Sequence, residues 1–269
     1  MIIAQISDPH ITSAEVDPRR ADAAAAGLQR AVQHIMELSP PPDLVLVTGD
    51  CANDGRQDEY GRVRDLLRPL AMPVFVIPGN HDHRERMRAA FGDQGAHALA
   101  GFVQYVVEGW PVRLIALDTH IPGRSEGELC ADRLGWLAAR LEEAPDQPTV
   151  IAMHHPPLQT GFAVLDSIGL TGSAELAALL VRHPQVERVV AGHLHMAVLR
   201  RFAGTLAMTC PATQHTLLPD FAQPERLTVL NEPPACLLHV WDADAGLITY
   251  TSLIGDHPTV ELHDGTRWL

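Results

Sequence analysis

The chain has 269 residues, of which 46% are apolar and 20% charged, a composition typical of a globular protein with one large domain or two small ones. No apolar run approaches the roughly 20 residues that span a bilayer, and no basic segment of the signal-peptide type opens the chain. The formal net charge of −13 repels nucleic-acid phosphates at long range. We therefore expect a cytoplasmic protein that acts on a small substrate and binds neither nucleic-acid polymers nor membranes.

The first half of the chain alternates predicted strands with predicted helices. Three apolar runs have the length of buried strands: Met1–Ile6, Leu44–Thr48 and Val74–Ile77. Helical composition lies between and after them, over Arg19–Glu37, Gln57–Leu67 and Asp82–Phe91. This rhythm predicts parallel strands joined by crossover helices.

The middle of the chain adds an antiparallel pair and two more strand–helix units. Phe102–Glu108 and Val112–Ala116 flank a turn at Gly109-Trp110-Pro111, so they predict a hairpin. Helices are predicted over Cys130–Glu143 and Ser173–Arg182, and strands over Thr149–Met153 and Val186–Ala191.

The last part of the chain is predicted to be rich in β-structure. Candidate strands cover Val198–Phe202, Thr205–Thr209, Cys236–Trp241 and Gly246–Leu253. The proline-rich residues 219–234 predict a long surface loop or an oligomer contact. We expect a single α/β domain over residues 1–269, with two stacked sheets flanked by helices. Four cysteines without CxxC spacing are expected to be reduced thiols: Cys51, Cys130, Cys210 and Cys236.

Five short polar segments follow apolar runs and carry the chemistry. They are Asp8-Pro9-His10, Gly49-Asp50, Gly79-Asn80-His81-Asp82, His154-His155 and Gly192-His193-Leu194-His195. They supply seven donors, which is too many for one ion and suits two ions that share a carboxylate: Asp8, His10, Asp50, Asn80, His154, His193 and His195. Carboxylate, imidazole and amide donors admit Mn, Fe, Zn or Co. The Asp-x-His and His-x-His spacings suit an extended backbone, in which residues two apart project to the same side.

These motifs resemble the calcineurin-like metallophosphoesterase superfamily over roughly residues 1–218. The resemblance implies a four-layer α/β/β/α sandwich with two stacked mixed sheets. It implies that one metal is held by Asp8, His10, Asp50 and His195. The other metal is then held by Asp50, Asn80, His154 and His193, with Asp50 bridging. The resemblance gives His154 as the ligand of its pair, although sequence alone leaves an exchange with His155 open.

The resemblance also implies a mechanism. Two divalent ions carry four positive charges, and the carboxylates of Asp8 and Asp50 together with a metal-bridging hydroxide remove three of them. About one positive charge remains, which matches the single negative charge of a phosphodiester. His81 is expected to assist the leaving group, with Asp82 orienting the His81 ring.

Three longer segments resemble the bacterial class III cyclic-nucleotide phosphodiesterases and glycerophosphodiesterases: Gly49–Gly55, Pro78–Asp82 and Met153–Pro157. In that branch the residue matching Asn53 contacts substrate phosphate, although an Asx turn explains this residue equally well. His215 matches another histidine of the substrate cleft. A homodimer or higher homo-oligomer is expected, formed through residues 219–234 and the β-segment 236–253.

The leading interpretation is a dinuclear-metal hydrolase of small phosphodiesters, of the cyclic-nucleotide or glycerophosphodiester type. A phosphomonoesterase is the nearest alternative. A non-catalytic protein-binding scaffold is the third, but such scaffolds usually lose metal ligands or the histidine after Asn80, and this chain keeps them.

Overall fold

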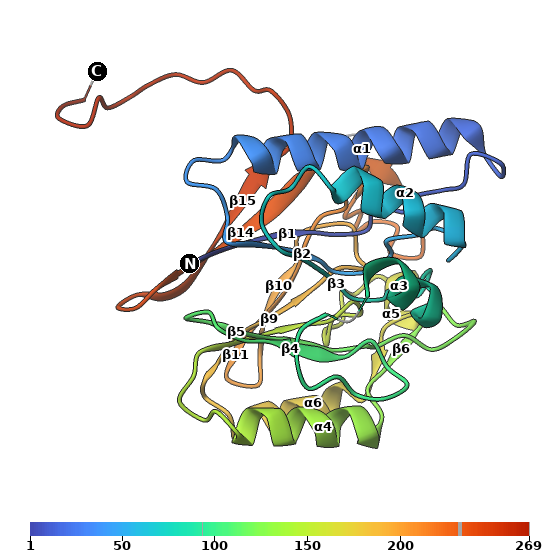
Figure 1. The fold of residues 1–269 in the computed structure, drawn as a ribbon, viewed down its shortest axis with the longest axis vertical. Helices are drawn as coiled ribbons and strands as arrows, with labels where there is room; N and C mark the ends of the chain where they lie inside the picture. The colour runs from blue at the N-terminus through green and yellow to red at the C-terminus, as the bar shows by residue number, and fades with distance from the viewer. Residues whose placement is uncertain (93, 231–232, 269) are drawn as a thin grey trace.

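A computed structural model describes residues 1–92, 94–230 and 233–268. Two β-sheets lie face to face, and helices cover the outer face of each sheet (Figure 1). The order of the layers is therefore helix, sheet, sheet, helix, which confirms the sandwich that the sequence motifs implied. No helix in the described ranges is long and apolar enough to cross a membrane.

The first sheet has the strand order β15-β14-β1-β2-β3. Its strands are β1 (Ile2–Ile6), β2 (Leu44–Val47), β3 (Val74–Val76), β14 (Ala235–Asp242) and β15 (Gly246–Leu253). The three N-terminal strands are parallel, whereas β14 pairs antiparallel with both β1 and β15. Helices α1 (Pro18–Glu37) and α2 (Gln57–Leu67) form the crossovers and cover this sheet (Figure 1).

The second sheet has the strand order β10-β11-β9-β7-β5-β4. Its strands are β4 (Tyr105–Val107), β5 (Arg113–Ala116), β7 (Thr149–Ala152), β9 (Val186–Ala191), β10 (Leu199–Phe202) and β11 (Thr205–Thr209). The pairs β5–β7, β7–β9 and β9–β11 are parallel, and the predicted hairpin β4–β5 is antiparallel. Helices α4 (Ala131–Glu142) and α6 (Ser173–Leu180) cover its outer face (Figure 1).

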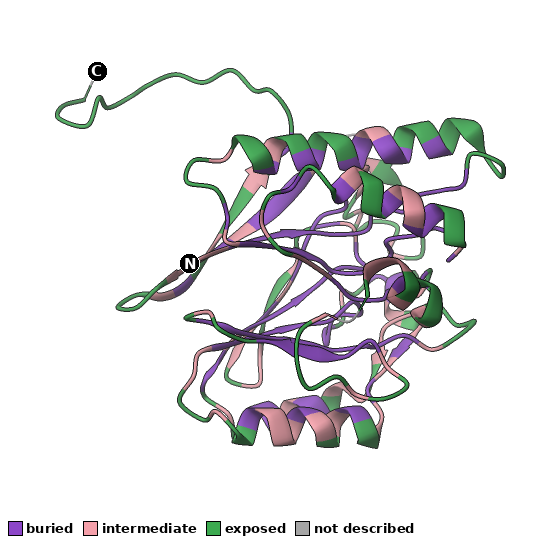
Figure 2. Cartoon of the chain, in the orientation of Figure 1, coloured by how far each residue is buried: buried purple, intermediate pink, exposed green. Residues whose placement is uncertain are grey.

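The alternation of side chains along the central strands divides the core into two parts. Val150 and Ala152 of β7 belong to the large apolar cluster that also includes the first sheet. Ile151, between them, belongs to the second cluster, which includes residues of α4 and α6. Successive residues of a strand point to opposite faces, so both faces of β7 are buried. Figure 2 shows that buried residues are concentrated in the strands between the two helical layers.

Several short elements differ from the sequence prediction. The predicted loop 219–234 contains strand β13 (Val229–Leu230), which pairs with β12 (Thr216–Leu217); residues 231 and 232 of this loop lie outside the described ranges. Strands β6 (Gly127–Glu128) and β8 (Leu170–Thr171) and helix α5 (Ala163–Ser167) were not predicted, because two to five residues are too few to show periodicity. Helix α3 (Arg84–Phe91) begins two residues later than predicted.

Candidate metal centre

The carboxyl ends of strands from both sheets meet at one edge of the sandwich. The side-chain Nε2 atom of Gln5 in β1 donates a hydrogen bond to the carbonyl oxygen of Ala191, at the end of β9, at 2.9 Å. At the neighbouring position His154 Nδ1, just after β7, donates to the carbonyl oxygen of Thr48, just after β2, at 2.8 Å. These bonds join the two sheets where the polar motifs begin.

Asp8, His10, Asp50 and His195 form the first group of donor atoms. The Nε2 atoms of His10 and His195 lie 3.1 Å apart. Asp50 Oδ2 lies 3.6 Å from His10 Nε2, and Asp8 Oδ1 lies 3.5 Å from His195 Nε2. Donors bound at about 2.1 Å to one ion in tetrahedral or octahedral geometry lie about 3.0–3.4 Å from each other. The spacing of this group therefore fits one metal ion.

Asp50, Asn80, His154 and His193 form the second group. Asp50 Oδ2 lies 3.4 Å from His154 Nε2, and Asn80 Oδ1 lies 3.1 Å from both His154 Nε2 and His193 Nδ1. Asp50 Oδ2 thus approaches a histidine of each group. The structure brings all seven predicted donors together at this edge, and their division between two ions stays a prediction.

The hydrogen bonds around the second group leave three lone pairs facing one point. His154 Nδ1 carries a hydrogen, because its partner is the carbonyl oxygen of Thr48, so the Nε2 atom of the neutral ring has a free lone pair. His193 Nε2 donates in the same way to the carbonyl oxygen of Ile168 at 3.0 Å, which frees Nδ1. Both lone pairs face the amide oxygen of Asn80. These three acceptors would repel one another without a positive charge between them, and either a proton on His154 Nε2 or a metal ion supplies that charge.

Electrostatics at the centre favour a positive charge between the carboxylates. Burial by itself would raise the pKa of Asp50, but His154 and His10 hold the pKa of this carboxyl well below its usual range. Burial would lower the pKa of His154, yet Asp50 and Asp8 raise it to about 9. Burial lowers the pKa of His10 to about 3 and that of His193 to about 4. Metal uptake therefore displaces a proton from His154 and becomes weaker as the pH falls.

The backbone of the motifs is not extended, so the conformation expected from the Asp-x-His and His-x-His spacings was wrong. Five of the seven donor residues have a left-handed backbone with positive φ: Asp8 (52°), His10 (43°), Asp50 (48°), His193 (69°) and His195 (54°). Such values are uncommon for residues other than glycine and concentrate at functional sites. The strands end in tight turns, and these turns direct alternate side chains into the centre.

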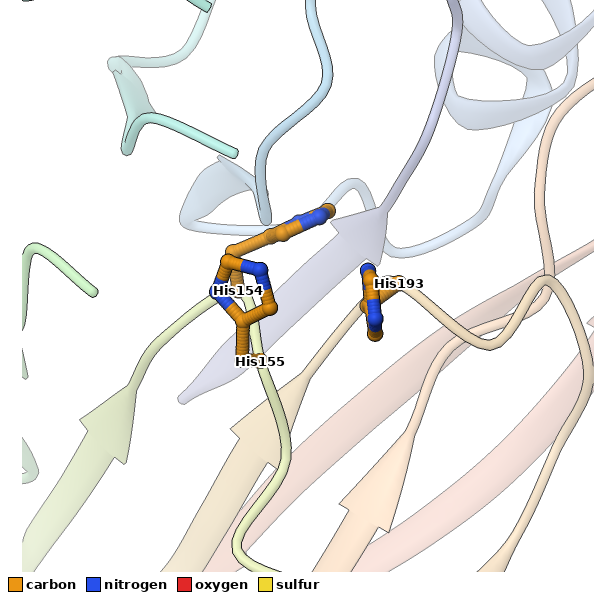
Figure 3. Close-up of side chains that lie close together, drawn as sticks. All are labelled: His154, His155 and His193. Carbon is orange, nitrogen blue, oxygen red and sulfur yellow. The ribbon is translucent and has the colours of Figure 1, made fainter. Parts of the chain in front are cut away.

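His155 lies close to the second group but uses both of its ring nitrogens elsewhere. His154, His155 and His193 lie close together at the ends of β7 and β9 (Figure 3). The Nδ1 atom of His155 lies 2.8 Å from Thr119 Oγ1, and its Nε2 donates to the carbonyl oxygen of Ser125 at 3.1 Å. The hydrogen bonds of His154 leave Nε2 open to the centre, so the geometry favours His154 as the ligand.

His81 lies at the exposed side of the centre, but Asp82 does not orient it as expected. The Nδ1 atom of His81 donates instead to the carbonyl oxygen of Asn53 at 2.7 Å. The buried carboxylate of Asp82 accepts hydrogen bonds from Tyr60 Oη and from three backbone amides, those of Cys51, Ala52 and Gly79, at 2.9–3.1 Å. Asp82 therefore holds together the loops after β2 and β3 that carry Asp50 and Asn80.

Asn53 contacts His81, and His215 contacts the donor residue His195. The carbonyl oxygen of Asn53 accepts from His81, and its side-chain Oδ1 accepts from Arg20 Nη2 at 2.8 Å. His215 Nε2 lies 3.1 Å from His195 Nδ1, on the side of that ring opposite the centre. The sequence did not predict the contact between Arg20 and Asn53. No local pattern marks this contact, because the start of α1 and the segment after β2 come together only in the fold.

Comparison with known proteins identifies the family. The family model described as calcineurin-like phosphoesterase matches residues 1–197, and the chain belongs to this family. It is 34% identical over 257 residues to a probable glycerophosphodiester phosphodiesterase, GpdQ, of Arcobacter nitrofigilis, covering 95% of this chain and 94% of the relative. It is 32% identical over 213 residues to the 3',5'-cyclic adenosine monophosphate phosphodiesterase CpdA of Pseudomonas aeruginosa, covering 79% and 76%.

Solved structures show the same fold. A dimetal phosphatase from Danio rerio superimposes with a TM-score of 0.68 at 16% identity, covering 95% of this chain and 99% of the other. A purple acid phosphatase from yellow lupin superimposes with a TM-score of 0.61 at 13% identity, covering 94% and 53%. These likenesses extend over the residues that carry the donor motifs.

Proposed function

We propose that this protein is a binuclear-metal-dependent phosphodiesterase that acts on small phosphodiesters of the cyclic-nucleotide or glycerophosphodiester type. The observation that carries the proposal is the convergence of lone pairs from Asn80, His154 and His193 on one point, beside a second donor group that shares Asp50. The named relatives, a glycerophosphodiesterase and a cyclic-nucleotide phosphodiesterase, supply the substrate class.

Each group of side chains has a separate task in this proposal. Two bound divalent ions, of Mn, Fe, Zn or Co, would activate water and stabilise the phosphoryl oxygens. Asp50 would lie between them, with Asp8, His10 and His195 on one side and Asn80, His154 and His193 on the other. His81 would stabilise or protonate the leaving oxygen through Nε2, because Nδ1 is held by Asn53. The second amide hydrogen of Asn53 Nδ2 would remain for a phosphate oxygen.

A substrate panel tests the proposal. Protein reconstituted with manganese should hydrolyse bis(p-nitrophenyl) phosphate, cAMP or glycerophosphoethanolamine with a higher kcat/KM than p-nitrophenyl phosphate. A strong preference for the monoester would identify a phosphomonoesterase instead. Absence of hydrolysis with every ester and every metal would leave only the scaffold interpretation.

We also propose a homodimer formed through the C-terminal part of the chain. Strand β15 is an edge strand and exposes Ile248, Tyr250 and Leu253. Beside it lies an apolar groove of about 610 Å³, whose lining includes Phe221 and Leu199. An edge strand next to an apolar groove is suited to pairing with a second copy. Sedimentation equilibrium should give twice the chain mass, and Tyr250→Lys should shift the protein to monomer.

The cytoplasm is the proposed location, because all four cysteines are free thiols, the form that a reducing compartment maintains. Fractionation of cells that produce the tagged protein tests this proposal: recovery in the periplasmic or extracellular fraction would contradict it.

A further inference from the structure

The side chain of Arg20 reaches the candidate substrate site from the first turn of α1. Its Nη2 atom lies 2.8 Å from Oδ1 of Asn53, which is buried. The neighbouring Arg19 is also exposed, but its side chain makes no hydrogen bond or ion pair with any residue of the described ranges. Of these two adjacent arginines, only Arg20 therefore has a side-chain contact beside the centre.

A buried carboxylate holds the two loops that bring Arg20 and Asn53 together. Glu59 of α2 is 1% exposed. Its oxygens accept hydrogen bonds at 3.0–3.1 Å from backbone amides of both loops: Ser13, Asp54 and Arg56. Asp17 then caps α1 by accepting from the backbone amide of Arg20 at 3.1 Å. The contact between Arg20 and Asn53 is therefore supported by fixed backbone on both sides.

Asn53 connects Arg20 to the donor groups through His81. The carbonyl oxygen of Asn53 accepts from His81 Nδ1 at 2.7 Å, and the backbone amide of His81 donates to Asp50 Oδ1 at 2.9 Å. The path from Arg20 to the shared carboxylate thus passes through two residues. Arg20 is therefore bonded directly to Asn53, the residue proposed to contact substrate phosphate.

The guanidinium of Arg20 keeps unused donors. It has five N–H groups, and within the described ranges only the one to Asn53 has a protein partner. No carboxylate of those ranges lies within ion-pair distance of it, whereas Arg56, Arg62 and Arg84 are each paired with an aspartate or glutamate. On a chain of net charge −13, an unpaired arginine beside a phosphate site is a local attraction for anions.

We infer that Arg20 is a specificity-determining residue, which binds an oxyanion on an ester arm of the substrate, a carboxylate or a second phosphate. The inference rests on the proposed phosphodiesterase function. Arg20 also accounts for the orientation of Asn53: the guanidinium holds the amide oxygen, so the NH₂ group is directed away from Arg20. Phosphodiesters with an anionic arm should bind more tightly than diesters of the same shape with neutral arms.

Two symmetric diesters provide the test, because both arms are the same and alkyl leaving groups are cleaved slowly. Dibutyl phosphate and bis(3-carboxypropyl) phosphate would be compared as competitive inhibitors of bis(p-nitrophenyl) phosphate hydrolysis by the manganese-loaded protein. Their dissociation constants would also be measured by calorimetry. The variants are Arg20→Gln and Arg20→Lys, with Arg19→Gln as the matched control for loss of one exposed positive charge.

Arg20→Gln should weaken binding of the dicarboxylate about tenfold, the size of one partly exposed charge-assisted hydrogen bond, and change binding of dibutyl phosphate less than about twofold. Arg20→Lys should keep part of the preference, and Arg19→Gln should keep all of it. Equal losses for both diesters would show that Arg20 acts only by holding Asn53, and unchanged binding would show no role; either result overturns the inference. Failure of the wild-type protein to hydrolyse any diester with any metal would instead contradict the proposed function, and calorimetry would still report the role of Arg20.

Discussion

The Nδ1 atom of His81 donates a hydrogen bond to the carbonyl oxygen of Asn53 at 2.7 Å, and this bond leaves Nε2 as the ring nitrogen available to a substrate. A carbonyl oxygen only accepts, so Nδ1 keeps its hydrogen in both the neutral and the charged ring. The other nitrogen, Nε2, is then the atom that gains or loses a proton. The ring of His81 also lies edge-on to that of His10, with 4.8 Å between the ring centroids, so His81 borders the first donor group.

His81→Ala should therefore lower the rate most for esters with poor leaving groups. We expect a loss of about a hundredfold in kcat for glycerophosphoethanolamine, the usual size of a general-acid contribution. p-Nitrophenolate needs little protonation, so the loss for bis(p-nitrophenyl) phosphate should be several times smaller. Steady-state kinetics with both esters measures the difference, and equal losses would show that His81 does not act on the leaving group.

Asn80→Ala should remove one metal ion and leave the other. Asn80 contacts only the second donor group, whereas the first group keeps Asp8, His10, Asp50 and His195. We expect the dialysed variant to retain about one manganese per chain where the wild type retains two. Metal analysis by mass spectrometry gives this ratio. Wild-type stoichiometry together with the wild-type rate of diester hydrolysis would exclude the assigned role of Asn80.

Gly79→Ala should damage the centre although Gly79 donates nothing to it. A Cβ atom at this position would lie 2.8 Å from Asp50 Cγ and would overlap Asp50 Oδ1 and the Asp50 backbone amide nitrogen. We expect at least a tenfold loss of manganese affinity, because the shared carboxylate has to move. Gly135→Ala in the exposed face of α4 meets nothing within 4 Å and should stabilise the protein by about 0.5–1 kcal/mol. Titration calorimetry and urea unfolding of both variants measure these effects; unchanged metal affinity in Gly79→Ala would contradict the geometry.

The buried His239 should make the protein less stable in acid. Its Nε2 donates to Gln5 Oε1 at 3.0 Å, and its Nδ1 lies 2.9 Å from Thr249 Oγ1. Burial, and secondarily the charge of Arg188, lowers the pKa of His239 to about 3 from an ordinary value of 6.5. Between these values the unfolded chain binds a proton that the folded chain does not. The contribution of His239 to stability is therefore complete above pH 6.5 and falls as the pH decreases toward 3.

Comparison with His239→Gln isolates this effect from the other histidines. The free energy of unfolding of the wild type should fall more steeply below pH 6.5 than that of the variant, by up to about 1.4 kcal/mol per pH unit. Urea unfolding of both proteins at several pH values gives the two slopes. Parallel curves would show that His239 is not kept neutral by burial.

The sequence predicted the long elements, because each depends on a repeated local pattern, and it predicted that the five polar segments would meet at one edge. Helix Gln57–Leu67 and strands Thr205–Thr209 and Gly246–Leu253 have the predicted bounds. The donor residues follow apolar strands, and the carboxyl ends of parallel strands meet at one edge of a sheet. The family resemblance then divided the donors into two groups.

What the sequence did not predict depends on contacts between distant segments. The carboxylate of Asp82 could bind His81 or backbone amides, and only the fold shows that Cys51 and Ala52 lie nearer. The left-handed turns at Asp8 and His10 leave no composition signal, because neither residue is glycine. The contact between Arg20 and Asn53 spans 33 positions of the chain and depends on how α1 enters the sandwich.

Crystals grown with manganese test the central claim most directly, because anomalous scattering locates each ion independently of the protein atoms. The account predicts two anomalous peaks roughly 3.5–4 Å apart. Asp50 should contact both peaks, His10 and His195 one of them, and Asn80, His154 and His193 the other. A single peak, or peaks away from these side chains, would contradict it.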